Sequence, residues 1–180
     1  LVALNELFGK KLDAEALCAV GDKIGADVPI CIKGGTLYSI TSGDMIAAEC
    51  DTNCIFVCIY PDFTLSTAEA YAKYDENPTE INPHYADFVS SIVCGSLSEG
   101  AGFISNVFTE IYHDSRIEEM KTDLLESGAV ISEMTGSGSV VFGVFESEET
   151  AAYSKKILSG KYPHVFTTRP VNCGVYVIER

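Results

Sequence analysis

The order of secondary-structure elements predicted after residue 54 constrains the fold of this chain most. Residues 54–60 (CIFVCIY) are rich in β-branched and aromatic side chains, which predicts a buried strand. Predicted helices follow, then two strands with a glycine-containing turn over 129–145, a helix over 148–158, and strands at 165–168 and 174–178. This order is a split βαβ arrangement with extra helices. The sequence therefore predicts an α+β fold whose C-terminal part is ferredoxin-like.

The residues before this region do not make a complete domain of their own. Leu1, Leu4, Leu7 and Phe8 form an apolar helical stripe that Gly9 ends, and no capping residue precedes it. A helix normally starts with Ser, Thr, Asp or Asn, so we expect this helix to begin before residue 1, in a longer protein. The predicted domains are 1–50, the end of a first domain, and 51–180.

Local signals place further elements in both parts. Asp13 is a predicted N-cap for a helix over 14–24, and Pro29 favours an extended residue before it, so Asp27 is expected in a turn that enters a short strand. Ser66 and Glu69 match a capping box for a helix that runs to residue 74. Strands over 36–41 and 45–50, a loop over 75–83, and helices over 85–97, 106–112 and 116–127 complete the prediction.

Charge and length restrict the ligands of the chain. It has 180 residues, with 12 Lys and Arg against 26 Asp and Glu, a formal charge of −14. Duplex nucleic acid is bound by basic patches, so we expect no nucleic-acid partner. The longest apolar runs are far shorter than the ~20 residues that span a bilayer, so we expect no membrane segment. A small phosphorylated ligand is compatible with this charge, and homodimerisation is left open.

The cysteines favour a reducing, cytoplasmic environment. The chain has 7 Cys, an odd number, and no CxxC pair. Cys50, Cys54 and Cys58 are spaced by four residues, which on a helix would line one face and suggest a metal site. Because the segment is predicted as a strand, we interpret these thiols as core packing. No metal ligand is assigned.

Three places could carry chemistry. Asp27 is a carboxylate in an apolar context, which suits either a catalytic group or an ordinary turn or capping residue. The turn 135–139 (TGSGS) could present backbone N–H groups to an anion, or it could simply be a hairpin turn that needs positive φ. It lacks the Lys of a P-loop.

The third place is the start of the helix at 66–71. A helix N-terminus favours an anion, and Tyr71 lies about one turn in, where its ring could stack on a base. In the alternative interpretation, Ser66 only caps the helix and Tyr71 packs against its neighbours. The residues alone leave both interpretations open.

The segments LNELFG, GADVPICIKGGT, LSTAEAY, NVFTE and MTGSGSVVFGVF, in this order, resemble one family. They resemble the 4-diphosphocytidyl-2-C-methyl-D-erythritol kinases of the galactokinase–homoserine kinase–mevalonate kinase superfamily. The resemblance spans residues 1 to about 145. It implies that the first domain ends a catalytic, ATP-binding domain of the ribosomal protein S5 domain 2-like fold, and that a ferredoxin-like domain follows.

The resemblance implies a reaction and a role for each matching residue. The family transfers the γ-phosphoryl group of ATP to the 2-hydroxyl of the erythritol moiety, a step of non-mevalonate isoprenoid biosynthesis. Asp27 matches the aspartate that accepts the proton of the attacking hydroxyl. Thr67 matches a hydroxyl near the substrate, and Tyr71 matches the aromatic that stacks on cytosine. Gly136, Ser137 and Gly138 match a superfamily motif close to the reacting phosphates.

The chain also departs from the family pattern. A catalytic Lys and a Gly-rich ATP loop of the family have no match here, and Lys23 and Lys33 do not fit the Lys motif. The 180 residues alone are therefore expected to be inactive, with ATP and Mg²⁺ bound largely by residues outside them. The alternatives are another kinase of the superfamily, such as a homoserine or mevalonate kinase, and a non-catalytic ferredoxin-like binding module.

Overall fold

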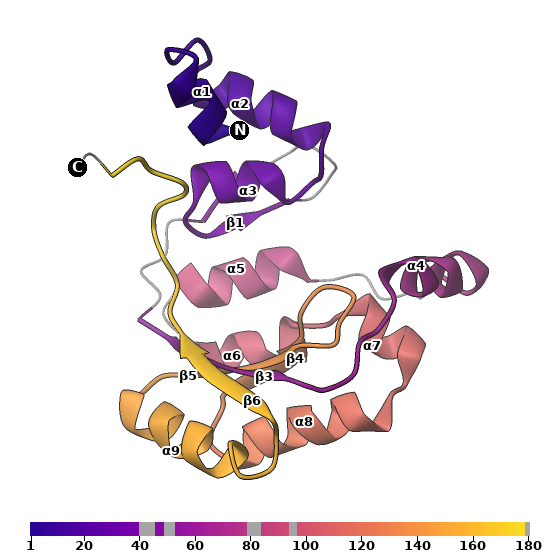
Figure 1. Ribbon diagram of the computed structural model, residues 1–180. Helices are drawn as coiled ribbons and strands as arrows, with labels where there is room; N and C mark the ends of the chain where they lie inside the picture. Colours follow the sequence, from indigo (N-terminus) through magenta and orange to yellow (C-terminus); the bar gives the residue numbers. More distant parts are fainter. Residues whose placement is uncertain (40–45, 49–52, 79–83, 94–96, 179–180) are drawn as a thin grey trace. The chain divides into compact units, whose positions relative to one another are not determined.

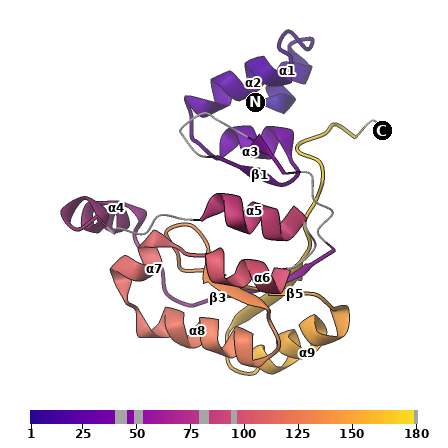
Figure 2. The same cartoon turned by 180° about the vertical axis from the view of Figure 1, so that it is seen from behind.

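The structure, a computed structural model, describes residues 1–39, 46–48, 53–78, 84–93 and 97–178. The chain divides into two compact units (Figures 1 and 2). Unit 1 comprises Leu1–Asp51 and Pro170–Arg180, and unit 2 comprises Thr52–Arg169. The last eleven residues thus group with the N-terminal part, whereas the sequence assigned them to the second domain. None of the helices in the described ranges is long and apolar enough to cross a membrane.

Unit 1 is built mainly from three helices. These are α1 (Val2–Leu7), α2 (Ala14–Asp22) and α3 (Val28–Lys33). Two short strands, β1 (Leu37–Tyr38) and β2 (Ile46–Ala47), pair antiparallel. Asp13 caps α2 as predicted, because its carboxylate accepts the Ala16 N–H at 2.8 Å. Residues 40, 41, 45, 49 and 50 of the predicted strands 36–41 and 45–50 lie outside the described residues.

Two predictions for unit 1 are wrong. The segment after Asp27 is the helix α3 and not a turn into a strand, with Pro29 in the first turn of the helix. Proline fits there because the first N–H groups of a helix have no partner in the helix, and a short apolar run does not distinguish strand from helix. Residues 174–178 are not a strand either; one backbone hydrogen bond, from Val175 N–H to the Cys31 carbonyl, joins them to α3.

Unit 2 contains a four-stranded antiparallel sheet. Its strands are β3 (Ile55–Tyr60), β4 (Ile131–Met134), β5 (Val141–Phe145) and β6 (His164–Thr168), in the spatial order β4-β5-β3-β6. The central strand β3 pairs with β5 on one side and β6 on the other. This is the strand order of a split βαβ fold, so the predicted α+β, ferredoxin-like arrangement is confirmed.

Helices cover both faces of this sheet (Figure 1). Helices α8 (Ser115–Glu126) and α9 (Glu148–Leu158) pack on one face over a core that includes Val57, Ile59 and Phe145. Helices α5 (Tyr85–Val93) and α6 (Leu97–Gly100) cover the other face, where a smaller cluster is centred on Cys54, Ile131 and Val144. The remaining elements are α4 (Thr67–Glu76), the 3₁₀ turn η1 (Ala101–Phe103) and α7 (Val107–Tyr112).

The cysteines on the central strand are core residues. Cys58 on β3 and Cys54 directly before it are both buried, and burial raises the pKa of the Cys58 thiol. Cys50 lies outside the described residues. In the described part of the chain, Cys18, Cys31, Cys54, Cys58 and Cys173 form no disulfide. The buried thiols of Cys18, Cys54 and Cys58 pack as small apolar side chains, whereas Cys31 and Cys173 are exposed.

Candidate functional site

The glycine turn between β4 and β5, residues 135–139, has two glycines in left-handed backbone conformations. Gly136 has φ of 58° and Gly138 has φ of 92°. The turn is closed by Thr135 N–H bonding the Val140 carbonyl at 2.9 Å and Gly138 N–H bonding the Thr135 carbonyl at 3.1 Å. A side chain at Gly136 would meet no atom within 4 Å, so this part of the turn faces open space. Small residues here leave room for a ligand to approach the backbone.

The turn and the start of α4 meet through their hydroxyl groups. The side-chain oxygens of Thr67 and Ser137 share a hydrogen bond of 2.8 Å across 70 residues of sequence. Ser66 caps α4 as predicted, accepting the Glu69 N–H at 3.3 Å. Two of the places found by sequence, the helix N-terminus and the glycine turn, therefore lie in contact with each other.

The loop that enters α4 is held to the same turn. Ser139 donates its hydroxyl proton to the Phe63 carbonyl at 2.5 Å, and the Arg116 guanidinium lies 3.7 Å from the centre of the Phe63 ring. The bidentate contact with Arg116 is the main cause that lowers the pKa of the Asp114 carboxyl below its usual value. The contact of Arg116 with the Phe63 ring joins the N-terminus of α8 to the loop, and the ion pair with Asp114 orients the guanidinium.

Tyr71 is 57% exposed on α4, and its ring meets Phe108 edge-on with 5.1 Å between centroids. This contact holds one edge of the ring and leaves much of the tyrosine open to solvent. Nearby, Tyr112 donates its hydroxyl proton to the Ser66 carbonyl at 3.0 Å. Burial, and secondarily the Glu69 carboxylate, raise the pKa of Tyr112. The Tyr71 ring therefore packs on a neighbour and still presents an exposed surface.

Asp27 lies in unit 1 at the N-cap position of α3. Its side chain is exposed and makes no capping hydrogen bond with the helix. The carboxylate is therefore not engaged in capping α3. The other site residues named from the sequence lie in unit 2.

Sequence reasoning missed two polar residues that contact the turn or the strand before it, Glu133 and Asn106. Glu133 on β4 is only 7% exposed and accepts hydrogen bonds from Thr109 Oγ1 at 2.8 Å, its neighbour Met134 N–H at 2.8 Å and Lys121 Nζ at 3.1 Å. Asn106, the N-cap of α7, donates to two carbonyls of the β4 end and the turn. A charged residue within the apolar strand ISEM was the one available signal for Glu133.

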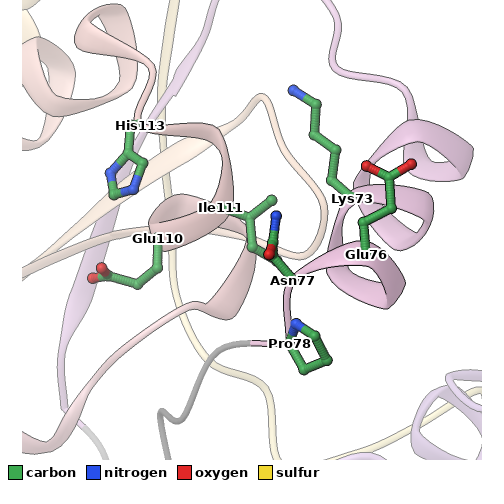
Figure 3. A pocket seen from close by; sticks show the side chains of 7 residues that line it. All are labelled: Lys73, Glu76, Asn77, Pro78, Glu110, Ile111 and His113. Carbon is green, nitrogen blue, oxygen red and sulfur yellow. The ribbon is translucent and has the colours of Figure 1, made fainter.

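A separate pocket of about 510 Å³ lies between the C-terminal parts of α4 and α7 (Figure 3). Its lining includes Lys73, Glu76, Glu110 and His113, and none of the residues predicted from sequence contributes to it. The Lys73 ammonium lies 4.7 Å from the centre of the Tyr112 ring. With charges of both signs in its wall, the pocket favours no single class of ligand.

The described residues contain no preformed cluster of metal ligands. Within the described ranges, no group of three or more His, Cys, Asp and Glu side chains could hold a metal ion. Mg²⁺ prefers carboxylate and phosphate oxygens in near-octahedral geometry. The turn itself carries hydroxyl and backbone N–H groups, which are donors of the kind that phosphate oxygens accept.

Comparison with known proteins gives many relatives of one kind. No protein-family model matches the chain. A 4-diphosphocytidyl-2-C-methyl-D-erythritol kinase of Caldanaerobacter subterraneus is 30% identical over 180 residues, 99% of this chain and 63% of the relative. The kinase of the same name from Lachnoclostridium phytofermentans is 35% identical over 94% of this chain and 60% of the relative. This chain is a homologue of these kinases. It spans less than two thirds of their length.

Solved structures of similar fold support the fold of this chain. A homoserine kinase from Cytophaga hutchinsonii matches 95% of this chain and 62% of its own, with a TM-score of 0.74 at 18% identity. A 4-(cytidine 5′-diphospho)-2C-methyl-D-erythritol kinase matches 93% of this chain and 60% of its own, with a TM-score of 0.68 at 18% identity. At this identity the likeness concerns the fold, and it agrees with the predicted kinase-type α+β architecture.

Proposed function

We propose that the protein carrying this chain is a kinase that transfers a phosphoryl group from ATP to the 2-hydroxyl of 4-diphosphocytidyl-2-C-methyl-D-erythritol. The observation that carries the proposal is the 30–35% identity to kinases of that name over nearly the whole chain. The motifs that carry the resemblance contain Asp27, the start of α4 and the glycine turn. The product belongs to non-mevalonate isoprenoid precursor biosynthesis.

In this proposal Asp27 accepts the proton of the attacking hydroxyl. An aligned carboxylate can take that proton during phosphoryl transfer, and such general base catalysis contributes about 10²–10⁴-fold in rate. The carboxylate is suited to the task because it is exposed and does not cap its helix. A side chain already engaged in a structural bond would be a poor acceptor.

The second unit contributes contacts to the phosphates and the base. ATP supplies the phosphoryl group that is transferred. The turn at Gly136, Ser137 and Gly138, with Thr67 beside it, offers hydroxyl and N–H donors to phosphate oxygens. Tyr71 offers an aromatic surface for the cytosine ring, and stacking of this kind contributes about 1–3 kcal/mol per base. Mg²⁺ accompanies ATP in this proposal.

We also propose a cytoplasmic location for the protein. The described cysteines form no disulfide, which is compatible with a reducing compartment, where disulfides are rare.

Product formation by the full-length protein tests the proposed function. The purified protein is incubated with ATP, Mg²⁺ and one of three alcohols: the diphosphocytidyl substrate, homoserine or mevalonate. We expect a new phosphomonoester signal in ³¹P NMR with the first alcohol alone. Phosphorylation of homoserine or mevalonate instead would show another kinase of the superfamily. No transfer to any alcohol, with retained ligand binding, would favour a binding module.

A further inference from the structure

Asn106 uses both ends of its side-chain amide on different elements. Its Nδ2 group donates to the Met134 carbonyl at 2.7 Å and to the Gly136 carbonyl at 2.9 Å. Its Oδ1 atom accepts the Phe108 N–H at 2.9 Å, which caps α7. One side chain therefore caps a helix and holds the end of β4 and the glycine turn in place.

Among the usual capping residues, asparagine alone can make this set of contacts. Ser, Thr, Asp and Asn all supply an oxygen to the first N–H groups of a helix. Both contacts to carbonyls need N–H donors, and only the amide of asparagine carries two donors beside its acceptor. An aspartate would keep the cap but set a carboxylate oxygen against two carbonyl oxygens.

The hydrogen bond from Asn106 to the Gly136 carbonyl lies next to the residues of the candidate site. The Gly136 carbonyl precedes Ser137, and the Ser137 hydroxyl bonds Thr67 on α4. Helix α7 is itself anchored to β4, because Thr109 Oγ1 donates to the buried Glu133 carboxylate. The turn is thus attached to a fixed helix on one side and contacts α4 on the other.

We propose that Asn106 is a positioning residue that sets the conformation of the glycine turn and so the place of the Ser137 hydroxyl relative to Thr67. The consequence for phosphate binding rests on the proposed function. The positioning of the turn itself is a property of this chain, and it can be measured without any activity.

The test compares Asn106→Asp with two controls in the 180-residue chain. Asn106→Ser keeps a capping oxygen, replaces the two amide N–H donors by one shorter hydroxyl and adds no charge. Ser147→Ala removes the cap of α9, whose hydroxyl accepts the Thr150 N–H at 3.2 Å, and leaves the turn untouched. Hydrogen exchange followed by ¹H–¹⁵N NMR reads the turn through the Gly138 N–H and reads helix α7 through the His113 N–H, which bonds the Thr109 carbonyl.

We expect exchange of the Gly138 N–H to accelerate about tenfold or more in both Asn106 variants, because each variant loses the two hydrogen bonds from the Asn106 amide to the Met134 and Gly136 carbonyls. The His113 N–H should change by less than about threefold, because the cap is kept. Ser147→Ala should leave both unchanged. Gly138 exchange in Asn106→Asp and Asn106→Ser equal to that in Ser147→Ala would overturn the proposal. If the aspartate variant fails to fold, Asn106→Ser decides alone.

Kinetics of the full-length protein separate the two proposals. If the proposed function is correct, Asn106→Ser should lower kcat about tenfold relative to the wild type and leave the KM for the diphosphocytidyl substrate within about twofold. An inactive wild-type protein with an altered turn in the variants would refute the function and keep the positioning role. An unaltered turn in an active protein would refute the positioning role alone.

Discussion

Replacing Gly138 by alanine should destabilise unit 2 much more than the same change at Gly136. Both glycines have positive φ, 92° and 58°, so each alanine meets backbone strain. At Gly138 the new Cβ would also lie 2.7 Å from Met134 Sδ and 2.8 Å from Leu65 Cδ1. At Gly136 it would meet no atom within 4 Å. Gly136→Ala is therefore a matched control for the strain alone.

The two contributions at Gly138 can be given magnitudes. A non-glycine residue in the left-handed region costs about 1–2 kcal/mol. Overpacking of a well-packed core costs about 1–3 kcal/mol, and Met134 is only 2% exposed, so it has little room to move. We expect Gly138→Ala to lower the free energy of unfolding by about 2–5 kcal/mol and Gly136→Ala by about 1–2 kcal/mol.

Urea unfolding of the 180-residue chain measures this difference. The chain has no Trp, so far-UV circular dichroism and tyrosine fluorescence report the transition. Since the chain has two compact units, the transition that includes the sheet of unit 2 is the one to compare. Equal losses in the two variants would show that Met134 and Leu65 do not confine Gly138, and the packing argument would be refuted.

Three further predictions concern other parts of the chain. Glu133→Ala should lower the free energy of unfolding by about 3 kcal/mol or more, because it removes the closer carboxylate from the partly buried Lys121 and leaves Thr109 without its acceptor. Glu133→Gln should lower it by about 1–2 kcal/mol. Equal losses in urea unfolding would contradict this prediction. Burial, then the hydrogen bond to Asp123, raises the pKa of Tyr162 to about 12, so its contribution to stability is complete below about pH 10 and disappears as the pH rises toward 12. The difference in absorbance at 295 nm between wild type and Tyr162→Phe should show this late ionisation, and a midpoint near pH 10 would contradict it. The 180-residue chain alone should not phosphorylate the diphosphocytidyl substrate, because the family's Lys and Gly-rich loop have no match in it, and measurable turnover would contradict that expectation.

Local sequence signals predicted the elements whose causes are local. Ser66 caps α4 through the N–H of Glu69, three residues later, and the pattern of residues 148–158 gave the bounds of α9. Pro29 shows the limit of such signals. A proline disfavours a helix before it but fits the first turn of one, so the same residue is compatible with either structure.

The candidate site depends on contacts that no local pattern contains. The sequence identified Thr67 and Ser137 separately, but the hydrogen bond between them joins residues 70 positions apart and follows from the pairing of β4 with β5 and the path of α4. Asn106 was predicted only within a helix, and its second contact is to a turn 30 residues away. Glu133 is tolerated in the interior because three donors surround it, and those donors come from the strand itself and two helices.

The role of Asp27 is tested most directly by kinetics of Asp27→Asn in the full-length protein. Its carboxylate makes no capping bond, so the variant should fold with wild-type stability. Asp13→Asn is a matched control, because it removes a carboxylate from the same unit and keeps a capping side chain. The account predicts that Asp27→Asn lowers kcat for phosphorylation of the diphosphocytidyl substrate by about 10²-fold or more, with KM nearly unchanged. Turnover close to that of the wild type and of Asp13→Asn would contradict it.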